Sequence, residues 1–92
     1  PQQILNMLNA ALAGNFLKAR TALLELLLKQ GVTGSEILND IAAEIYDLDV
    51  PEVQKAELIE KVGETEYRVS RGGAEQIHLE AMLAKFALIK KK

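Results

Sequence analysis

The clearest structural signal in the sequence lies in residues 35–48, which read SEILNDIAAEIYDL. Apolar side chains recur there every three or four residues, and polar or acidic side chains fill the positions between them. The apolar positions are Ile37, Leu38, Ile41, Ala42, Ile45 and Leu48. An α-helix gathers such positions on one face, so we predict a helix over about 35–47 with one buried face. Thr33 or Ser35 is its expected N-terminal cap.

The same periodicity continues on both sides of this segment and predicts four further helices. They cover residues 2–13, 16–30, 51–71 and 74–90. Gly14, Gly31 and the pair Gly72-Gly73 mark helix ends, because glycine readily adopts the left-handed conformation that stops a helix. No stretch of the chain alternates between apolar and polar residues as a strand does. We therefore predict an all-α fold, a compact five-helix bundle.

Local signals refine where these helices begin. Asn15 is the candidate cap of the second helix, and Pro1 and Pro51 suit first helical turns because proline needs no hydrogen-bonded N–H there.

In the fourth helix one face is expected to point inward: Val53, Ala56, Ile59, Val62 and Val69. Gly63 falls in the middle of this helix, where glycine costs on the order of 1 kcal/mol relative to alanine. It marks either a close helix crossing or a break in the helix, and we favour the crossing.

Length and composition narrow the class of protein. The 92 residues suffice for one core, so residues 1–92 are predicted to be a single domain. The absence of cysteine excludes disulfides and Cys-ligated zinc and points to a reducing, cytoplasmic location. Charged residues interrupt every apolar stretch, so no membrane span is expected. Since the chain enters a helical pattern directly at Pro1, we expect a fragment of a longer chain.

Charge is distributed unevenly around the formal net value of −2. Residues 35–66 hold ten acidic residues against only Lys55 and Lys61, whereas both flanking regions are net basic. Affinity for nucleic acid depends on Lys and Arg that neutralise phosphates, so this acidic centre disfavours a DNA-binding surface. A solvated outer face is the simpler interpretation. The basic end, Lys90-Lys91-Lys92, suits the negative end of a helix, and a DNA contact is the weaker alternative there.

Candidates for catalysis are few. His78 is the only histidine and cysteine is absent, so neither a Cys–His pair nor a His-rich metal site is possible. Asp40 and Glu44 lie one helical turn apart, but solvated helix faces share that spacing. Gly72-Gly73 lacks the Lys and Ser/Thr that complete a phosphate-binding loop. We predict no catalytic residue, no cofactor-binding residue and no metal site.

Two helices carry more apolar surface than one buried face requires. In the fifth, Ile77, Ala81, Ala84 and Leu88 share one face. The opposite face holds Leu79, Met82, Leu83 and Phe86. Such a helix is either central in its own domain or shared with a neighbour, and the pattern leaves both alternatives open.

The second helix is similarly broad. Its main apolar face consists of Phe16, Ala19, Leu23, Leu26 and Leu27. That face is widened by Leu17, Leu24 and Leu28. Arg20 projects from within this arc. Its guanidinium can extend to water or pair with a carboxylate on another helix, and we expect a structural salt bridge rather than recognition of an external ligand.

Four segments, taken in order, resemble the C-terminal domain of archaeal replication factor C small subunits. They are residues 8–20 (LNAALAGNFLKAR), 45–51 (IYDLDVP), 63–69 (GETEYRV) and 79–88 (LEAMLAKFAL). Each is unspecific alone, but their order and spacing are specific, and the match extends over about residues 5–88. His78 departs from the Gln-like polar residue of that family, and the triple-lysine tail is not typical of it.

The resemblance implies a five-helix collar domain that joins the subunits of a pentameric clamp loader into a disc. ATPase domains in such a protein open a sliding clamp around primed DNA. Their ATP- and magnesium-binding motifs have no counterpart in these residues, so no cofactor is implied for this chain. The implied partners are other clamp-loader subunits, both small-subunit copies and the large subunit. The clamp and primed DNA would be reached through the parent complex, and no membrane is involved.

The leading hypothesis is thus an oligomerisation domain without catalytic activity. The interface candidates on the fifth helix are Ile77, Ala81, Ala84 and Leu88 if its large side chains turn inward, or Met82 and Phe86 if the reverse holds. Candidates on other helices are Leu24, Leu28, Arg20 and Arg68. A monomeric adaptor that binds a partner helix or peptide in a groove remains an alternative. A DNA-binding helical domain is a second, against which the acidic centre argues.

Overall fold

The computed structural model describes residues 2–89. These residues form helices joined by short turns, as the apolar periodicity of the sequence predicts. The helices are α1 (Gln2–Leu12), α2 (Phe16–Leu24), α3 (Gly34–Tyr46), α4 (Glu52–Ser70) and α5 (Glu75–Leu88), and a π-helical segment, η1 (Glu25–Lys29), continues α2. No strand occurs within residues 2–89. The predicted all-α fold with five helices is confirmed. The expectations for Pro1 and for Lys90-Lys91-Lys92 lie outside the described residues.

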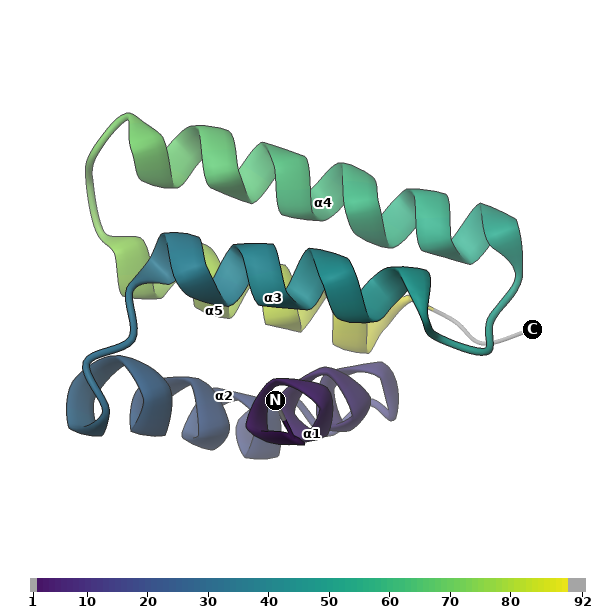
Figure 1. Ribbon diagram of the computed structural model, residues 1–92, viewed down its shortest axis with the longest axis horizontal. Coiled ribbons are helices and arrows are strands. Elements are labelled where there is room, and N and C mark those ends of the chain that lie inside the picture. The colour runs from purple at the N-terminus through teal and green to yellow at the C-terminus, as the bar shows by residue number, and fades with distance from the viewer. Residues whose placement is uncertain (1, 90–92) are drawn as a thin grey trace.

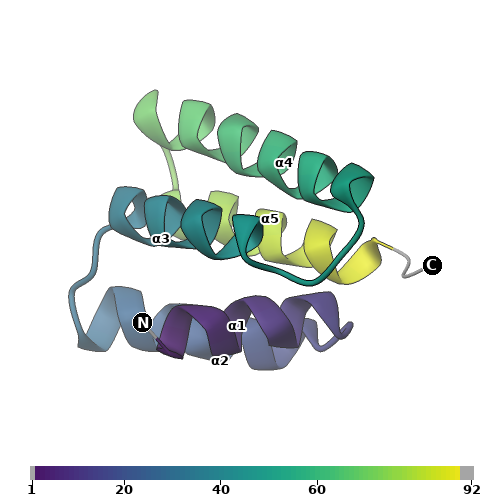
Figure 2. The ribbon, with the colours of Figure 1, turned by 45° about the vertical axis from the view of Figure 1, so that its right-hand side comes forward.

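The helices form three tiers, with α4 along the top of Figure 1, α3 and α5 in the middle, and α1 and α2 at the bottom. The turned view in Figure 2 keeps these tiers apart. Helix α5 contacts α1, α2, α3 and α4. It is therefore the central helix of the domain.

The core is one cluster of apolar side chains to which every α-helix contributes. Helix α5 supplies four members that are almost fully enclosed: Leu79, Met82, Leu83 and Phe86. The predicted face of α3 is also largely correct. Ile37, Leu38, Ile41 and Ile45 are buried, and Ala42 and Leu48 pack against the cluster.

The predicted inward face of α4 was partly wrong. Val53 is 74% exposed and Ala56 is exposed as well. Val62 is buried as predicted, and Ile59 and Val69 pack against the core cluster, but the other buried side chains of α4 are Leu58 and Thr65. At 3.6 residues per turn, Val53 and Ala56 lie about 140° and 160° around the helix from Leu58, so they point to solvent. The buried hydroxyl of Thr65 donates a hydrogen bond to the carbonyl of Lys61 at 2.8 Å, which satisfies it.

Gly63 does not mark a helix crossing in this chain, which corrects that interpretation. It is exposed, and a Cβ atom built on it would meet no neighbouring atom within 4 Å. Packing against the other described helices therefore gives no reason for glycine at this position.

Helix α3 begins at a capping box built by Thr33 and Glu36. The Thr33 hydroxyl accepts a hydrogen bond from the Glu36 backbone N–H at 3.1 Å, and the Glu36 carboxylate accepts one from the Thr33 N–H at 3.0 Å. The Thr33 backbone N–H that donates to this carboxylate lowers the pKa of Glu36 most, and the Thr33 side chain lowers it further. Of the two predicted caps, Thr33 is the one observed. Asn15 occupies the predicted cap position of α2, although its side chain makes no capping bond.

A second contact joins the starts of α3 and α5. The backbone N–H of Gly34 donates a hydrogen bond to Oε2 of Glu75 at 3.2 Å. A Cβ atom at position 34 would lie 2.5 Å from the same oxygen, so only glycine allows the carboxylate to come this close.

Residues 25–29 leave the α-helical pattern and form the π-helical segment η1. Its end is closed by hydrogen bonds from the Gln30 N–H to the Glu25 carbonyl at 3.1 Å and from the Val32 N–H to the Leu26 carbonyl at 2.9 Å. The prediction of one α-helix over 16–30 missed this change, because apolar spacing over a single turn does not separate the two helix types.

Replacing Thr33 with alanine should lower the free energy of unfolding by about 1 kcal/mol, because the capping bond to Glu36 is lost. Ser35→Ala is the matched control at an exposed position beside it and should change stability by less than about 0.5 kcal/mol. Urea denaturation followed by circular dichroism measures both variants. Equal losses for the two would show that the capping box adds nothing to stability.

Replacing Gly63 with alanine should raise the free energy of unfolding by about 0.5–1 kcal/mol, since alanine favours the helix and the new methyl group meets nothing. Gly73→Ala should destabilise instead, because Gly73 has a φ of 102°, which L-residues avoid. The same denaturation experiment tests the pair. A loss of stability in the Gly63→Ala variant would contradict the open space found around position 63.

Candidate subunit interface

One face of α5 is not covered by another helix, although the large side chains of the opposite face are buried in the core. Ile77 is 62% exposed and Leu88 is 76% exposed, while Ala81 is exposed and Ala84 is half-buried. These residues are spaced four, three and four apart, so they form one apolar stripe along the helix. The structure thus selects the alternative in which the large side chains turn inward.

Met82 and Phe86 were the candidates for the reverse arrangement. They are 3% and 0% exposed and belong to the core cluster. These two side chains therefore serve the core, and they are not part of the exposed face of α5.

Helix α2 and its continuation η1 carry a second uncovered stripe. Leu17 and Leu28 are 71% and 70% exposed, and Leu24 between them is half-buried. Residues seven and four positions apart lie on the same side of a helix, so these three leucines face one direction. The core already occupies the other side, through Ala19, Leu23 and Leu26.

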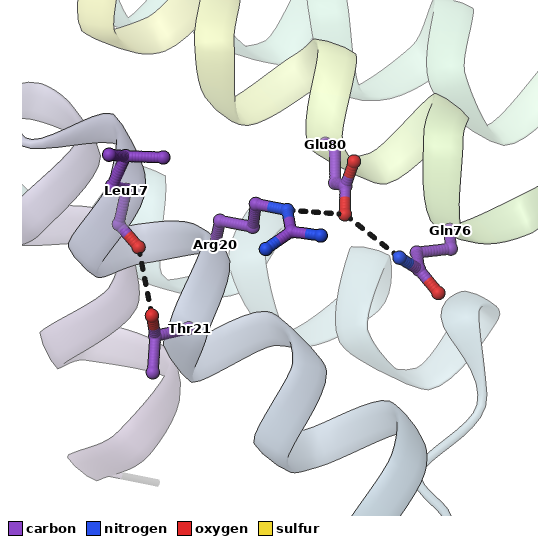
Figure 3. A network of polar contacts seen from close by, with 5 residues as sticks. All are labelled: Leu17, Arg20, Thr21, Gln76 and Glu80. Atoms are coloured by element: carbon purple, nitrogen blue, oxygen red, sulfur yellow. Dashed lines mark hydrogen bonds and ion pairs between the residues drawn. The ribbon is translucent and has the colours of Figure 1, made fainter.

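An ion pair joins the two helices between these stripes. The Nε of Arg20 on α2 lies 3.0 Å from Oε2 of Glu80 on α5, and the Gln76 amide donates to the same oxygen at 3.0 Å (Figure 3). The predicted pairing of Arg20 with a carboxylate on another helix is confirmed. The contact uses only Nε, and within the described part of the chain the terminal nitrogens of the guanidinium have no hydrogen-bond partner.

Because α2 and α5 are in contact, the two stripes and the ion pair form one surface, which we call the α2–α5 surface. Its members are Leu17, Arg20, Leu24, Leu28, Ile77, Ala81, Ala84 and Leu88. An exposed ion pair contributes only ~0–1 kcal/mol, so Arg20 matters more for the charge it presents than for stability.

Arg68 lies elsewhere, on α4. Its Nη2 is 3.7 Å from the Glu64 carboxylate, which Lys61 also contacts at 2.7 Å. The hydrogen bond and charge of Lys61, followed by the charge of Arg68, lower the pKa of Glu64. The structure therefore does not bring Arg68 together with Arg20.

A hollow of about 580 Å³ opens between α4 and α5. Its lining includes Val53, Leu88 and Ile89, but Glu57, Glu60, Lys61 and Lys85 interrupt these apolar side chains. A groove for an amphipathic helix presents a continuous apolar floor, which this hollow lacks. Farther along the same seam, His78 lines a smaller hollow with Arg68 and Met82.

Four exposed apolar side chains were not among the predicted interface residues: Leu17, Tyr46, Val53 and Tyr67. Leu17 had been assigned only to the broad apolar face of the second helix, and Val53 had been assigned to the core. A helical projection of α4 that starts from Leu58 would have shown that Val53 and Tyr67 share the outer side.

Residues 2–89 give no support to a metal site or to a membrane-spanning helix. No three His, Cys, Asp or Glu side chains gather there as a metal site would require. In the same residues, no helix combines the length and the apolar character needed to cross a membrane.

The family model for the replication factor C C-terminal domain matches residues 1–85. The chain belongs to this family. The domain is also 46% identical over its whole length to a replication factor C small subunit of Pyrococcus horikoshii and 47% identical to that of Pyrococcus furiosus. A small subunit of Sulfurisphaera tokodaii is 40% identical over the whole domain. The domain spans 11% of the length of the two Pyrococcus relatives and 29% of the Sulfurisphaera relative.

The two faces of α5 should respond differently to truncation. Phe86→Ala should cost about 3–5 kcal/mol of unfolding free energy, because it leaves a cavity in the core. Leu88→Ala should cost less than about 0.5 kcal/mol, because that side chain is already in solvent. Denaturation of dilute protein measures both. A large loss for Leu88→Ala in dilute solution would contradict the assignment of this face as uncovered.

Proposed function

We propose that this domain is the collar of a clamp-loader small subunit and holds the subunits of the loader together. The observation that supports this role most strongly is the uncovered α2–α5 surface. Leu17, Leu28, Ile77 and Leu88 are each more than 60% exposed, although the chain has a complete core without them. Burying one such side chain contributes about 1.5–3 kcal/mol, so a partner that covers the surface gains enough to offset part of the cost of association.

Membership of the replication factor C family supports the same role, since the relatives are small subunits of a multi-subunit factor by name. We infer that the partners are further small-subunit copies and a large subunit. The sliding clamp and primed DNA are then contacted through the parent complex, in the cytoplasm. ATP and magnesium belong to domains outside this sequence in the proposal.

A non-catalytic role fits the chemistry of the described residues. Local partners lower the pKa of Glu36 and of Glu64: Thr33, the cap of α3, acts on Glu36, and Lys61 and Arg68 act on Glu64. His78 is half-buried at the edge of a small hollow and has no carboxylate bonded to it among residues 2–89. These groups do not form the polarised cluster that general acid–base catalysis uses. We therefore assign the domain a binding function.

Replacing Leu28 or Ile77 with glutamate should abolish self-association, because a charge would be buried without a partner in the assembled state. Both positions are solvent-exposed in the single chain, so the far-ultraviolet circular dichroism should not change. Sedimentation velocity over a wide concentration range measures the mass of each variant and of the unaltered chain.

Ala43→Glu is the matched control, since it places the same charge at an exposed position of α3 away from the α2–α5 surface. It should associate as the unaltered chain does. If the unaltered chain remained a monomer at every concentration, self-association through this domain would be excluded. The adaptor alternative would then gain support if the monomer bound an amphipathic helix.

A further inference from the structure

The smaller hollow between α4 and α5 has a basic rim, and we call it the seam hollow. Its volume is about 240 Å³. Each helix lines it with residues at the same spacing, 61, 64, 65 and 68 on α4 and 78, 81, 82 and 85 on α5. Positions three, four and seven apart lie on one side of a helix, so the two rows face each other.

Charged side chains are sorted between the seam hollow and the rest of these two helices. Helices α4 and α5 together carry seven glutamates, and of these only Glu64 lines the hollow. They carry five basic side chains, histidine included, and four of them line it: Lys61, Arg68, His78 and Lys85. A solvated helix face mixes charges of both signs. The sorting therefore distinguishes this hollow from an ordinary solvated face.

Basic side chains face one another across the seam. Residues 71–74 reverse the chain between α4 and α5, so the two helices run antiparallel (Figure 1). Lys61 therefore lies opposite Lys85, and Arg68 lies opposite His78. Both lysines also line the larger hollow, which places them at the same end of the seam. Because like charges repel, a bound anion would relieve this arrangement.

Glu64 compensates for only part of the positive charge. Its carboxylate lies 2.7 Å from Nζ of Lys61 and 3.7 Å from Nη2 of Arg68. The second distance is longer than an N–H···O hydrogen bond, so the guanidinium keeps donors for another acceptor. Lys85 has no ion pair within residues 2–89. Three cations and one carboxylate thus leave two positive charges at the hollow, before any protonation of His78.

We propose that the seam hollow binds a phosphate group that carries nearly two negative charges, as inorganic phosphate and phosphate monoesters do at neutral pH. Arg68 on α4 and Lys85 on α5 donate to its oxygens from the two sides of the seam. Ala81 leaves room for it, because its short side chain lines the hollow without filling it. This inference goes beyond the proposed oligomerisation role and does not depend on it.

Charge also favours a monoester over the backbone of a nucleic acid. A backbone phosphodiester carries a single negative charge and is one link of a long anionic chain. Such a chain would continue past the hollow toward Glu57 and Glu60, which line the adjoining hollow on the same seam. Their carboxylates would repel it, whereas a single phosphate group stays among the basic side chains.

Titration with inorganic phosphate at constant ionic strength tests the proposal, with the backbone amide signals of the ¹⁵N-labelled chain as the readout. We expect saturable shifts confined to residues around the seam hollow. Lys85→Gln should weaken binding about fivefold, because one charged contact is lost. Lys18→Gln is the matched control, since it removes the same charge from an exposed position on α2. It should bind phosphate as the unaltered chain does.

Glu64→Gln distinguishes a binding site from a purely structural cluster, because its effects on stability and on binding should be opposite. The variant loses the carboxylate that contacts Lys61 and Arg68, so its resistance to urea should fall slightly. Phosphate binding should nevertheless tighten about fivefold, because the anion that competes for these cations is gone. A loss of stability without tighter binding would contradict the proposal.

Three further results would overturn it. Shifts that grow without saturation would indicate general charge screening in place of a site. Equal effects of Lys85→Gln and Lys18→Gln would place the phosphate elsewhere. Tighter binding of dimethyl phosphate or of a single-stranded oligonucleotide than of inorganic phosphate would assign the hollow to a diester.

Self-association is measured separately from phosphate binding. Ala81 belongs both to the seam hollow and to the α2–α5 surface, so the titration is repeated on Leu28→Glu, which should be a monomer. Binding by this variant would support the phosphate site whether or not the unaltered chain assembles. Failure of both chains to bind would remove the phosphate site and leave the oligomerisation role intact.

Discussion

Burial of one side of α5 by all the other helices is the constraint on which the rest of the domain depends. Leu79, Met82, Leu83 and Phe86 fill the space between the tiers, and α1, α2, α3 and α4 each contact α5. Once these side chains are enclosed, the opposite side of α5 lies outside the core. The exposure of Ile77 and Leu88 is thus a direct consequence of how the core is formed.

Sequence periodicity predicted most of the helices because their ends carry strong local signals. Glycines with positive φ follow α1, η1 and α4, and the capping box fixes the start of α3. The partner of Arg20 was also predictable in kind, since a guanidinium within an apolar arc requires a carboxylate nearby. Which carboxylate it would be depended on the packing of α2 against α5, which spacing along the chain does not specify.

Other features depended on packing that a single sequence leaves open. In α4, apolar residues occur on several sides, so the choice between Val53 and Leu58 as core residues required the position of α3 and α5 beneath it. In α5 both faces are apolar, and the greater volume of Phe86 and Met82 against the alanines opposite decides which one fills the core. Gly63 was interpreted as a helix crossing but is exposed, because the sequence does not show which side of α4 the other helices cover.

The hydrogen bond between Gly34 and Glu75 has a mechanical consequence. It joins the first turn of α3 to the first turn of α5, and a side chain at position 34 would displace the Glu75 carboxylate from this contact. The start of α5 is therefore held by a polar contact to α3 as well as by the core and the turn at Gly72-Gly73.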